Sequence, residues 1–319
     1  MDFRINIGDW VSAAVDYMVV NFGPIFDAIS GVVGLIANTI EGGLLGLPAW
    51  LLALILVALG LWRVGWRFAL FTAVALTLIM GMNLWNQSVS TLALVLSASF
   101  VALLIGIPLG IAMAKSDTVA TIVRPVLDFM QTMPSFVYLI PAVMFFGLGK
   151  VPGTIATLVF AMPPVVRLTN LGIRQVSVEN VEAGLAFGCT DRQLLFKVQL
   201  PLAMPSIMAG VNQTIMLSLS MVVIASMIGA GGLGETVLTG IQRLQVGLGF
   251  EGGLGVVILA IILDRITQSF GQRSGAFAAL RNFIRPLRDS IEAMRDSFSP
   301  FADRIEPASD SRGAAPPPA

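Results

Sequence analysis

Long apolar runs alternate with short polar stretches between residues 48 and 270. Seven runs approach ~20 residues, the length that spans a bilayer as a helix. They lie at about 48–62, 67–85, 89–113, 133–149, 152–168, 205–229 and 252–270. Because lipid forces each span to satisfy its own backbone hydrogen bonds, we expect every span to be helical. The pattern predicts an all-α, polytopic membrane bundle of about seven transmembrane helices.

The N-terminal residues 1–47 carry a weaker pattern. Apolar residues recur there at helical spacing between 25 and 40, but Asp27, Asn38, Glu41 and several glycines interrupt them. We interpret this region as an amphipathic extracytoplasmic segment that lies on the outer face of the membrane. The alternative is an eighth span over 21–47, which would place the N-terminus inside.

The C-terminal tail also has a periodic pattern. Apolar residues of 271–305 follow alternating spacings of three and four, with arginines off this stripe and two prolines that should break it. This pattern predicts a cytoplasmic amphipathic helix on the inner leaflet, or a helix packed on a partner subunit. The composition of 306–319 is typical of disorder.

Lysine and arginine indicate the orientation. If the polar segment 182–201 is cytoplasmic, 16 of the 19 basic residues lie inside, and only Arg4, Lys150 and Arg243 lie outside. Cytoplasmic loops of membrane proteins carry such an excess. The sequence therefore predicts a multi-pass membrane protein with its N-terminus outside and its C-terminus in the cytoplasm.

Composition excludes several kinds of chemistry. The chain is 56% hydrophobic and only 12% charged, it contains no histidine, and Cys189 is its single cysteine. Catalytic triads, histidine metal sites and internal disulfides are therefore excluded. An intramembrane enzyme would need paired carboxylates at membrane depth, where we find only Asp264. We expect no catalytic residue, no metal and no cofactor in this chain, and the zero net charge argues against a nucleic-acid partner.

The segment 182–201, EAGLAFGCTDRQLLFKVQLP, interrupts the apolar pattern. Its first residues favour a short helix, and Gly188 permits a sharp turn. Asp191 can then cap a second short helix from Arg192 to Lys197. Leu200-Pro201 should end this second helix and redirect the chain into the next span. We therefore predict a compact knob of two short helices within the loop 167–204.

The spacing of this segment resembles the cytoplasmic signature of permease subunits of bacterial ABC importers. That signature runs E-A-A, three residues, G, nine residues, I-x-L-P, and here Gly replaces the third residue and Val the Ile. The stretches 131–153, 160–176, 228–234 and 263–268 resemble more narrowly the permeases of glycine betaine/L-proline importers. The resemblance covers about 85–270. Methionine-importer permeases share the signature but are typically shorter.

The resemblance implies a type I ABC importer permease fold, in a transmembrane domain over 48–270 with cytoplasmic coupling helices. It implies a homodimer in the bacterial inner (plasma) membrane, two copies of an ATP-binding subunit that bind ATP and Mg, and an extracytoplasmic substrate-binding protein. In such permeases the knob docks on the ATPase. The residues that the resemblance assigns to this coupling are Glu182, Ala183, Gly184, Gly188, Asp191, Leu200 and Pro201.

The chain itself lacks an ATPase motif. The stretch Gly147 to Lys150 suggests a phosphate loop, but Met144 and Val151 occupy positions that need Gly and Ser or Thr. We therefore expect import of glycine betaine or proline betaine, driven by a separate ATPase. The alternatives are a permease for choline, carnitine, proline or methionine, and a nucleotide-independent osmotic channel. ATP dependence of uptake separates an importer from a channel.

Four polar residues of the sixth span share one helix face, about 140° wide at 100° per residue. They are Asn212, Gln213, Ser220 and Ser226. Polar side chains at membrane depth usually face a bundle interior or a wet path. We hypothesise that this face lines the translocation path, and ordinary hydrogen bonding between helices is the equal alternative.

Overall fold

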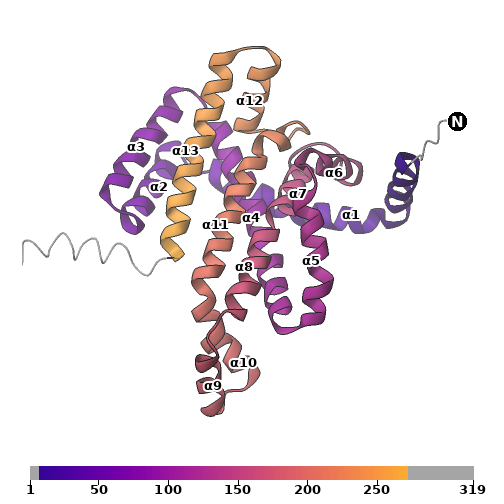
Figure 1. The fold of residues 1–319 in the computed structure, drawn as a ribbon. Helices are drawn as coiled ribbons and strands as arrows, with labels where there is room; N and C mark the ends of the chain where they lie inside the picture. The colour runs from indigo at the N-terminus through magenta and orange to yellow at the C-terminus, as the bar shows by residue number, and fades with distance from the viewer. Residues whose placement is uncertain (1–6, 272–319) are drawn as a thin grey trace, which may run out of the picture. The chain divides into compact units, whose positions relative to one another are not determined.

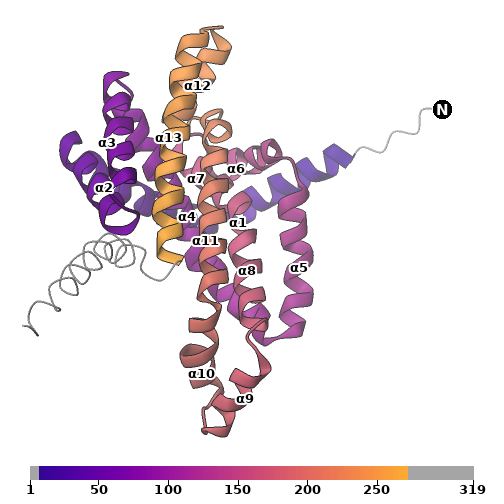
Figure 2. The ribbon, with the colours of Figure 1, turned by 60° about the vertical axis from the view of Figure 1, so that its left-hand side comes forward.

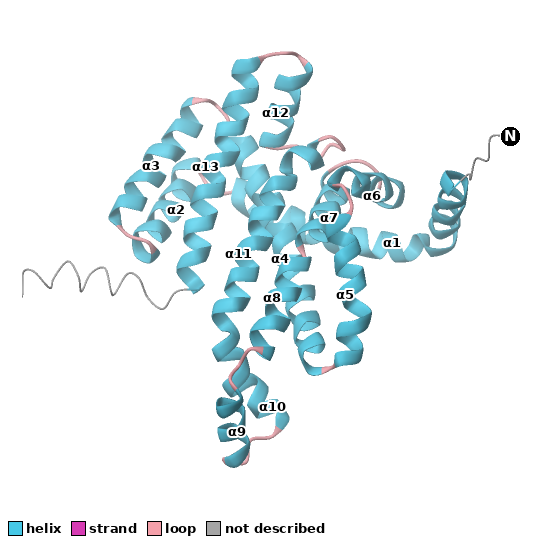
Figure 3. Ribbon diagram, viewed as in Figure 1, coloured by secondary structure: helices cyan, strands magenta, loops and turns pink. Residues whose placement is uncertain are grey.

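The computed structural model describes residues 7–271, and every regular element in that range is a helix (Figures 1 and 3). The N-terminal half contains α1 (Ile7–Leu45), α2 (Ala49–Arg63), α3 (Trp66–Gly81), α4 (Trp85–Lys115), α5 (Asp117–Thr132), η1 (Ser135–Tyr138) and α6 (Leu139–Phe146). The remainder contains α7 (Lys150–Ala161), α8 (Pro163–Arg174), α9 (Val178–Ala186), α10 (Asp191–Leu194), η2 (Leu195–Gln199), α11 (Leu200–Ser226), α12 (Leu233–Gln242) and α13 (Val246–Gly271). The predicted tail beyond 271 lies outside the described residues.

The all-helical class is confirmed, and the seven apolar runs correspond to helices. They match α2, α3, α4, the stretch of η1 and α6, the α7–α8 pair, α11 and α13. Among the described residues five helices are long and apolar enough to cross a membrane, or six if one bent pair is a single span. The helices α2 and α3 are apolar but shorter, with 15 and 16 residues.

The fourth predicted run, 133–149, differs most from its prediction. It contains only η1 and the eight-residue α6, and this stretch is bent by 108° against α5. Residues 117–132, counted above as an inner loop, form α5. Pro134 follows the end of α5, where Met133 is extended as the residue before a proline usually is. Polar residues lower the hydropathy of α5, which is why the sequence pattern missed it.

The N-terminal segment forms one 39-residue helix, α1, with Pro24 inside it. Its apolar stretch is long enough to cross a membrane, and only 11% of it is buried. Phe26 stacks on Phe145 of α6 at 4.5 Å between ring centroids. Near its other end, Glu41 pairs with Lys150 of α7 at 2.5 Å and accepts a hydrogen bond from Ser90 of α4. These contacts fix α1 to the bundle, and both an interfacial and a spanning position stay open.

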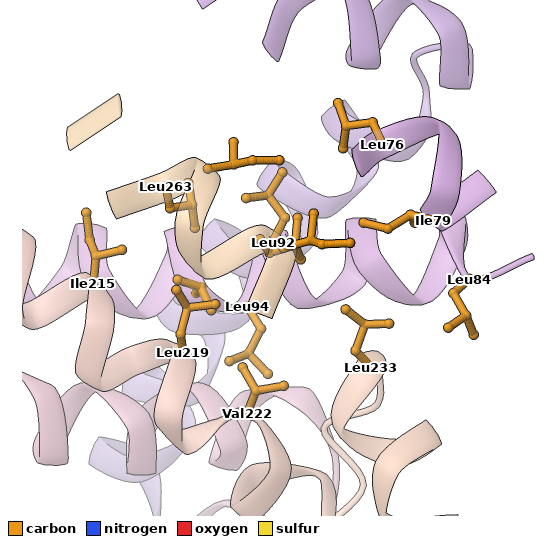
Figure 4. Close-up of a cluster of buried hydrophobic side chains, with 14 of the residues drawn as sticks. Leu76, Ile79, Leu84, Leu92, Leu94, Ile215, Leu219, Val222, Leu233 and Leu263 are labelled. Atoms are coloured by element: carbon orange, nitrogen blue, oxygen red, sulfur yellow. The ribbon is translucent and has the colours of Figure 1, made fainter. Parts of the chain in front are cut away.

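The main apolar core lies where α3, α4, α11 and α13 meet (Figure 4). Side chains from all four helices interdigitate there, and Leu233 at the start of α12 closes one end. The most deeply buried members are Ile79, Val95, Val222, Leu233 and Ile262. Lipid tails are as apolar as these side chains, so close packing rather than the hydrophobic effect holds such a core together.

The helices α4 and α8 pack closely against each other. Gly106 and Gly110 lie one turn apart on α4, and a Cβ atom at either would come within 2.6 Å of Val165 or Thr169 of α8. Small residues spaced four apart let membrane helices approach this closely. The chain then passes from α8 through α9 and α10 into α11, so α8 and α11 run antiparallel side by side (Figures 1 and 2).

The peripheral helices α2 and α3 pack on each other and on α13. Arg63 at the end of α2 donates a hydrogen bond to the Ser269 carbonyl at 3.5 Å, and its guanidinium lies 3.9 Å from the Phe270 ring centroid. This cation–π contact attaches the α2–α3 pair to the last turns of α13.

Candidate functional site

The predicted knob exists and lies at one end of the bundle, where α9 and α10 extend beyond the other helices (Figures 1 and 2). Gly188 makes the turn between them with a φ of 77°, a left-handed conformation that glycine adopts without steric cost. The Cys189 N–H donates to the Gly184 carbonyl at 3.1 Å and closes the end of α9. The predicted role of Gly188 in the turn agrees with this geometry.

The predicted capping role of Asp191 is wrong. Thr190 is the N-cap of α10: its hydroxyl accepts from the Gln193 N–H, and the Gln193 side chain accepts from the Thr190 N–H. This reciprocal arrangement is a capping box, which the T-x-x-Q spacing could have revealed. Asp191 is instead the first residue of α10, where its negative charge suits the positive end of the helix dipole.

Leu200 and Pro201 do not end the knob, contrary to the prediction. The second knob helix is α10 followed by the π-helix η2, which continues directly into α11. The Leu200 N–H donates to the carbonyl of Leu195, five residues back. Pro201 has no N–H, so the Lys197 carbonyl lacks its usual α-helical donor, and a π turn accommodates this loss without breaking the helix. The knob is therefore continuous with a membrane helix.

The inner side of the knob is tightly packed and its outer side is apolar and exposed. A Cβ atom on Gly184 would come within 2.7 Å of Leu194 on α10, so glycine permits the close contact between α9 and α10. Glu182 and Ala183 are exposed on α9. The Phe187 side chain is 91% exposed, and Leu185 and Phe196 are also exposed. Exposed large apolar residues in a polar segment indicate a contact surface, which the sequence analysis overlooked.

Three polar contacts hold the base of the knob near the turn between α4 and α5. Arg174, the last residue of α8, donates to the Met113 carbonyl at 2.7 Å and pairs with Asp117 at 2.6 Å. In the knob itself, the Asp191 carbonyl accepts from Lys115 at 3.4 Å. The knob thus contacts the end of α4 besides the two helices that carry it.

The four polar residues predicted on one face of α11 fall into two environments. Gln213 and Ser220 are exposed. Asn212 is half-buried against α13, where its amide donates to Asp264 at 2.9 Å and its carbonyl oxygen accepts from the Thr267 hydroxyl at 2.6 Å. Ser226 is buried and donates to the Val223 carbonyl. The structure therefore separates Asn212 and Ser226 from Gln213 and Ser220.

A second exposed polar feature lies on α5 and α8 and was not predicted. Asp128 of α5 and Arg167 of α8 form an ion pair at 2.5 Å, with side chains 65% and 42% exposed. Their separation of 39 residues gives no local signal, so the pair could be found only once α5 was known to pack beside α8.

An apolar helical bundle with a helical knob at one end has the fold of an ABC importer permease. The chain resembles the permease of the MetNI methionine ABC transporter in an inward-facing crystal form, with a TM-score of 0.54 and 22% identity over 61% of this chain and 98% of that chain. Residues 106–275 match the family model described as binding-protein-dependent transport system inner membrane component. The chain belongs to this family.

Curated relatives cover most of the chain. It is 53% identical to the glycine betaine/proline betaine transport system permease protein ProW of Escherichia coli, over 85% of this chain and 76% of that protein. It is 52% identical to the glycine betaine/carnitine transport permease protein GbuB of Listeria monocytogenes, over 85% of this chain and 97% of that protein. The chain is thus the multi-pass inner-membrane permease component of an ABC importer, in which a partner ATPase hydrolyses ATP.

Proposed function

We propose that this permease imports glycine betaine, proline betaine or a closely related compatible solute. The supporting observation is the identity of about half of all aligned residues with permeases named for these solutes, including the glycine betaine transport system permease protein OpuAB of Bacillus subtilis at 48% over 83% of this chain. Carnitine, which appears in the name of one such relative, is the nearest alternative solute.

The knob is the proposed contact with the ATPase. Two permease copies would form the pathway, and each would present its knob to one of two ATPase subunits that bind ATP and Mg, while this chain binds no cofactor. The exposed side chains of Phe187 and Leu185 support a contact surface. The proposed coupling residues are Glu182, Ala183, Gly184, Gly188, Asp191, Leu200 and Pro201, since they shape the knob or continue it into α11.

The proposed orientation places the knob and the C-terminus in the cytoplasm and the N-terminus outside, where an extracytoplasmic binding protein would deliver the solute. Lys115, Arg174, Arg192 and Lys197 lie at the knob end of the bundle, whereas Lys150 and Arg243 lie at the opposite end, and this excess supports the orientation. Within the membrane, Gln213 and Ser220 would line the translocation path, and Asn212 and Ser226 would position the helix that carries them.

The test reconstitutes the permease with its ATPase and binding protein in vesicles and measures uptake of labelled glycine betaine alongside ATP hydrolysis. We expect uptake that requires ATP. Gly188→Pro removes the left-handed turn, and Glu182→Lys reverses a charge on the knob, so both should leave ATP hydrolysis but abolish its coupling to uptake. Glu179→Lys, the same charge change one turn earlier on α9, is the matched control.

Three outcomes would contradict the proposal. Uptake without nucleotide would indicate a channel. Undiminished uptake by both knob variants would remove the coupling role of the knob. Uptake of carnitine or choline, with none of either betaine, would assign a different solute.

A further inference from the structure

Helix α5 exposes a polar arc along its length. Its buried residues, Ala120, Leu127 and Met130, mark the side that packs on α4 and α8. At 100° per residue, five exposed polar side chains share a separate arc about 80° wide. These residues are Asp117, Thr121, Arg124, Asp128 and Gln131. Exposing this polar arc to lipid would cost a large amount of free energy.

The Asp128–Arg167 ion pair lies well above the end of the bundle that carries the knob. Asp128 is eleven residues beyond Asp117 and Arg167 is seven residues before Arg174. At about 1.5 Å per residue, the pair is about 10–16 Å above the Asp117–Arg174 pair at the end that carries the knob. Half the hydrocarbon thickness of a bilayer is about 15 Å. The exposed ion pair is therefore near the middle of the membrane.

The ion pair shares one surface of the bundle with Gln213 and Ser220. Both ribbon views show α8 between α5 and α11 (Figures 1 and 2). On α11, Gly210 packs against α8 and Asn212 bonds to α13, so the exposed stripe with Gln213 and Ser220 lies between these two flanks. Ser218 of α11 and Thr169 of α8 both contact α4. At 100° per residue they lie about 140° from Gln213 and about 160° from Arg167 on their own helices, so both exposed faces point away from α4.

An exposed ion pair at this depth needs water or a polar partner, because charges at membrane depth face cavities or protein rather than lipid. Its two charges are opposite, adjacent and accessible. A zwitterionic solute with a quaternary ammonium and a carboxylate presents the complementary pair of charges. A guanidinium can bind a carboxylate through two N–H groups, and a quaternary ammonium, which has no N–H, interacts with a carboxylate through charge alone.

We propose that Asp128 and Arg167 are specificity-determining residues of the translocation path, where Arg167 binds the carboxylate of a zwitterionic solute and Asp128 faces its quaternary ammonium. This inference rests on the proposed function. The ion pair opens as the solute enters, and each side chain exchanges one opposite charge for another. When the solute leaves, the pair re-forms. No charge is left uncompensated in the membrane at either stage.

The test replaces both charged side chains by neutral amides, which can still form a hydrogen bond with each other. In the double variant Asp128→Asn/Arg167→Gln, we expect ATP-driven uptake of glycine betaine to fall at least about tenfold, which corresponds to 1.4 kcal/mol of lost binding to the path. ATP hydrolysis stimulated by the loaded binding protein should stay within twofold, because the knob is untouched. The matched control is Glu41→Gln/Lys150→Gln, which neutralises the ion pair between α1 and α7 and should transport normally.

The outcomes distinguish the inference from the proposed function. Normal uptake by the Asp128–Arg167 double variant would overturn the inference alone. Parallel loss of ATP hydrolysis, or of co-purification of the subunits, would also overturn it by showing that the pair serves assembly, such as contact with the second permease copy. Absence of betaine uptake by the unmodified complex would overturn the proposed function and the inference with it.

Discussion

Two carboxylates lie between the ends of this bundle, in opposite surroundings. Asp128 pairs with the cation Arg167 on an exposed surface between α5 and α8. Asp264 is half-buried between α11 and α13 and accepts hydrogen bonds from two neutral amides, those of Asn212 at 2.9 Å and Gln268 at 2.6 Å. One carboxylate oxygen of Asp264 accepts from both amides, whereas Asp128 is held only by an exposed ion pair. The contact between α11 and α13 is thus suited to holding helices together, and the contact between α5 and α8 is suited to meeting a solute.

The largest expected effect comes from Asn212→Leu. This change removes the amide that donates to Asp264 and the oxygen that accepts from Thr267, so Asp264 keeps only Gln268 as a donor and Thr267 keeps only backbone acceptors of its own helix. The loss of a hydrogen bond to a charged group costs about 1.5–3 kcal/mol. We expect a clear fall in the thermal unfolding temperature of the purified permease. A wild-type unfolding temperature would show that the α11–α13 seam is not structural.

The same Asp→Asn change at the two carboxylates tests the comparison directly. Asp264→Asn keeps an oxygen that can accept both amide hydrogen bonds, so stability and uptake should stay near wild type. Asp128→Asn leaves the Arg167 charge unpaired on the exposed surface, and we expect uptake to fall about tenfold with the unfolding temperature unchanged. Equal effects of the two changes on uptake would contradict the distinction between the α11–α13 contact and the α5–α8 contact.

Gln213→Leu should have a smaller effect. Gln213 is exposed on the surface that also carries Arg167, so its loss should reduce uptake several-fold through a less polar path. Assembly with the ATPase should stay intact, as measured by co-purification. Persistent wild-type uptake would indicate that this face of α11 is structural.

Thr267→Val should have the smallest effect. The Thr267 hydroxyl donates to Asn212 at 2.6 Å, and the valine keeps the shape of the side chain. The loss of one neutral hydrogen bond costs about 1 kcal/mol. We expect a small fall in unfolding temperature and unchanged uptake. In the Asn212→Leu background the change should have less effect, because only the backbone acceptors of α13, such as the Leu263 carbonyl, remain for the hydroxyl.

The sequence predicted the class, the apolar runs and the position of the knob, because each depends on local spacing. It missed α5 because Arg124, Asp128 and Gln131 make that helix read as a polar loop. It missed the ten-residue α12, which folds back on α13 after the glycine-rich turn at 229–232. The 100° periodicity put four polar residues on one face of α11, and the structure divides them into two exposed and two packed residues. It could not show that Asn212 has partners on α13, since that depends on how two distant helices pack.

The π-helix between the knob and α11 sets the direction in which the knob faces. Its turn contains about one residue more than an α-helical turn. Deleting one residue of Leu195–Gln199 would restore α-helical spacing and rotate the knob by about 100° around the α11 axis. Phe187 would then face away from its present direction, although every residue of the contact surface would be retained. The length of this one segment therefore determines how an ATPase bound to the knob is oriented relative to the membrane helices.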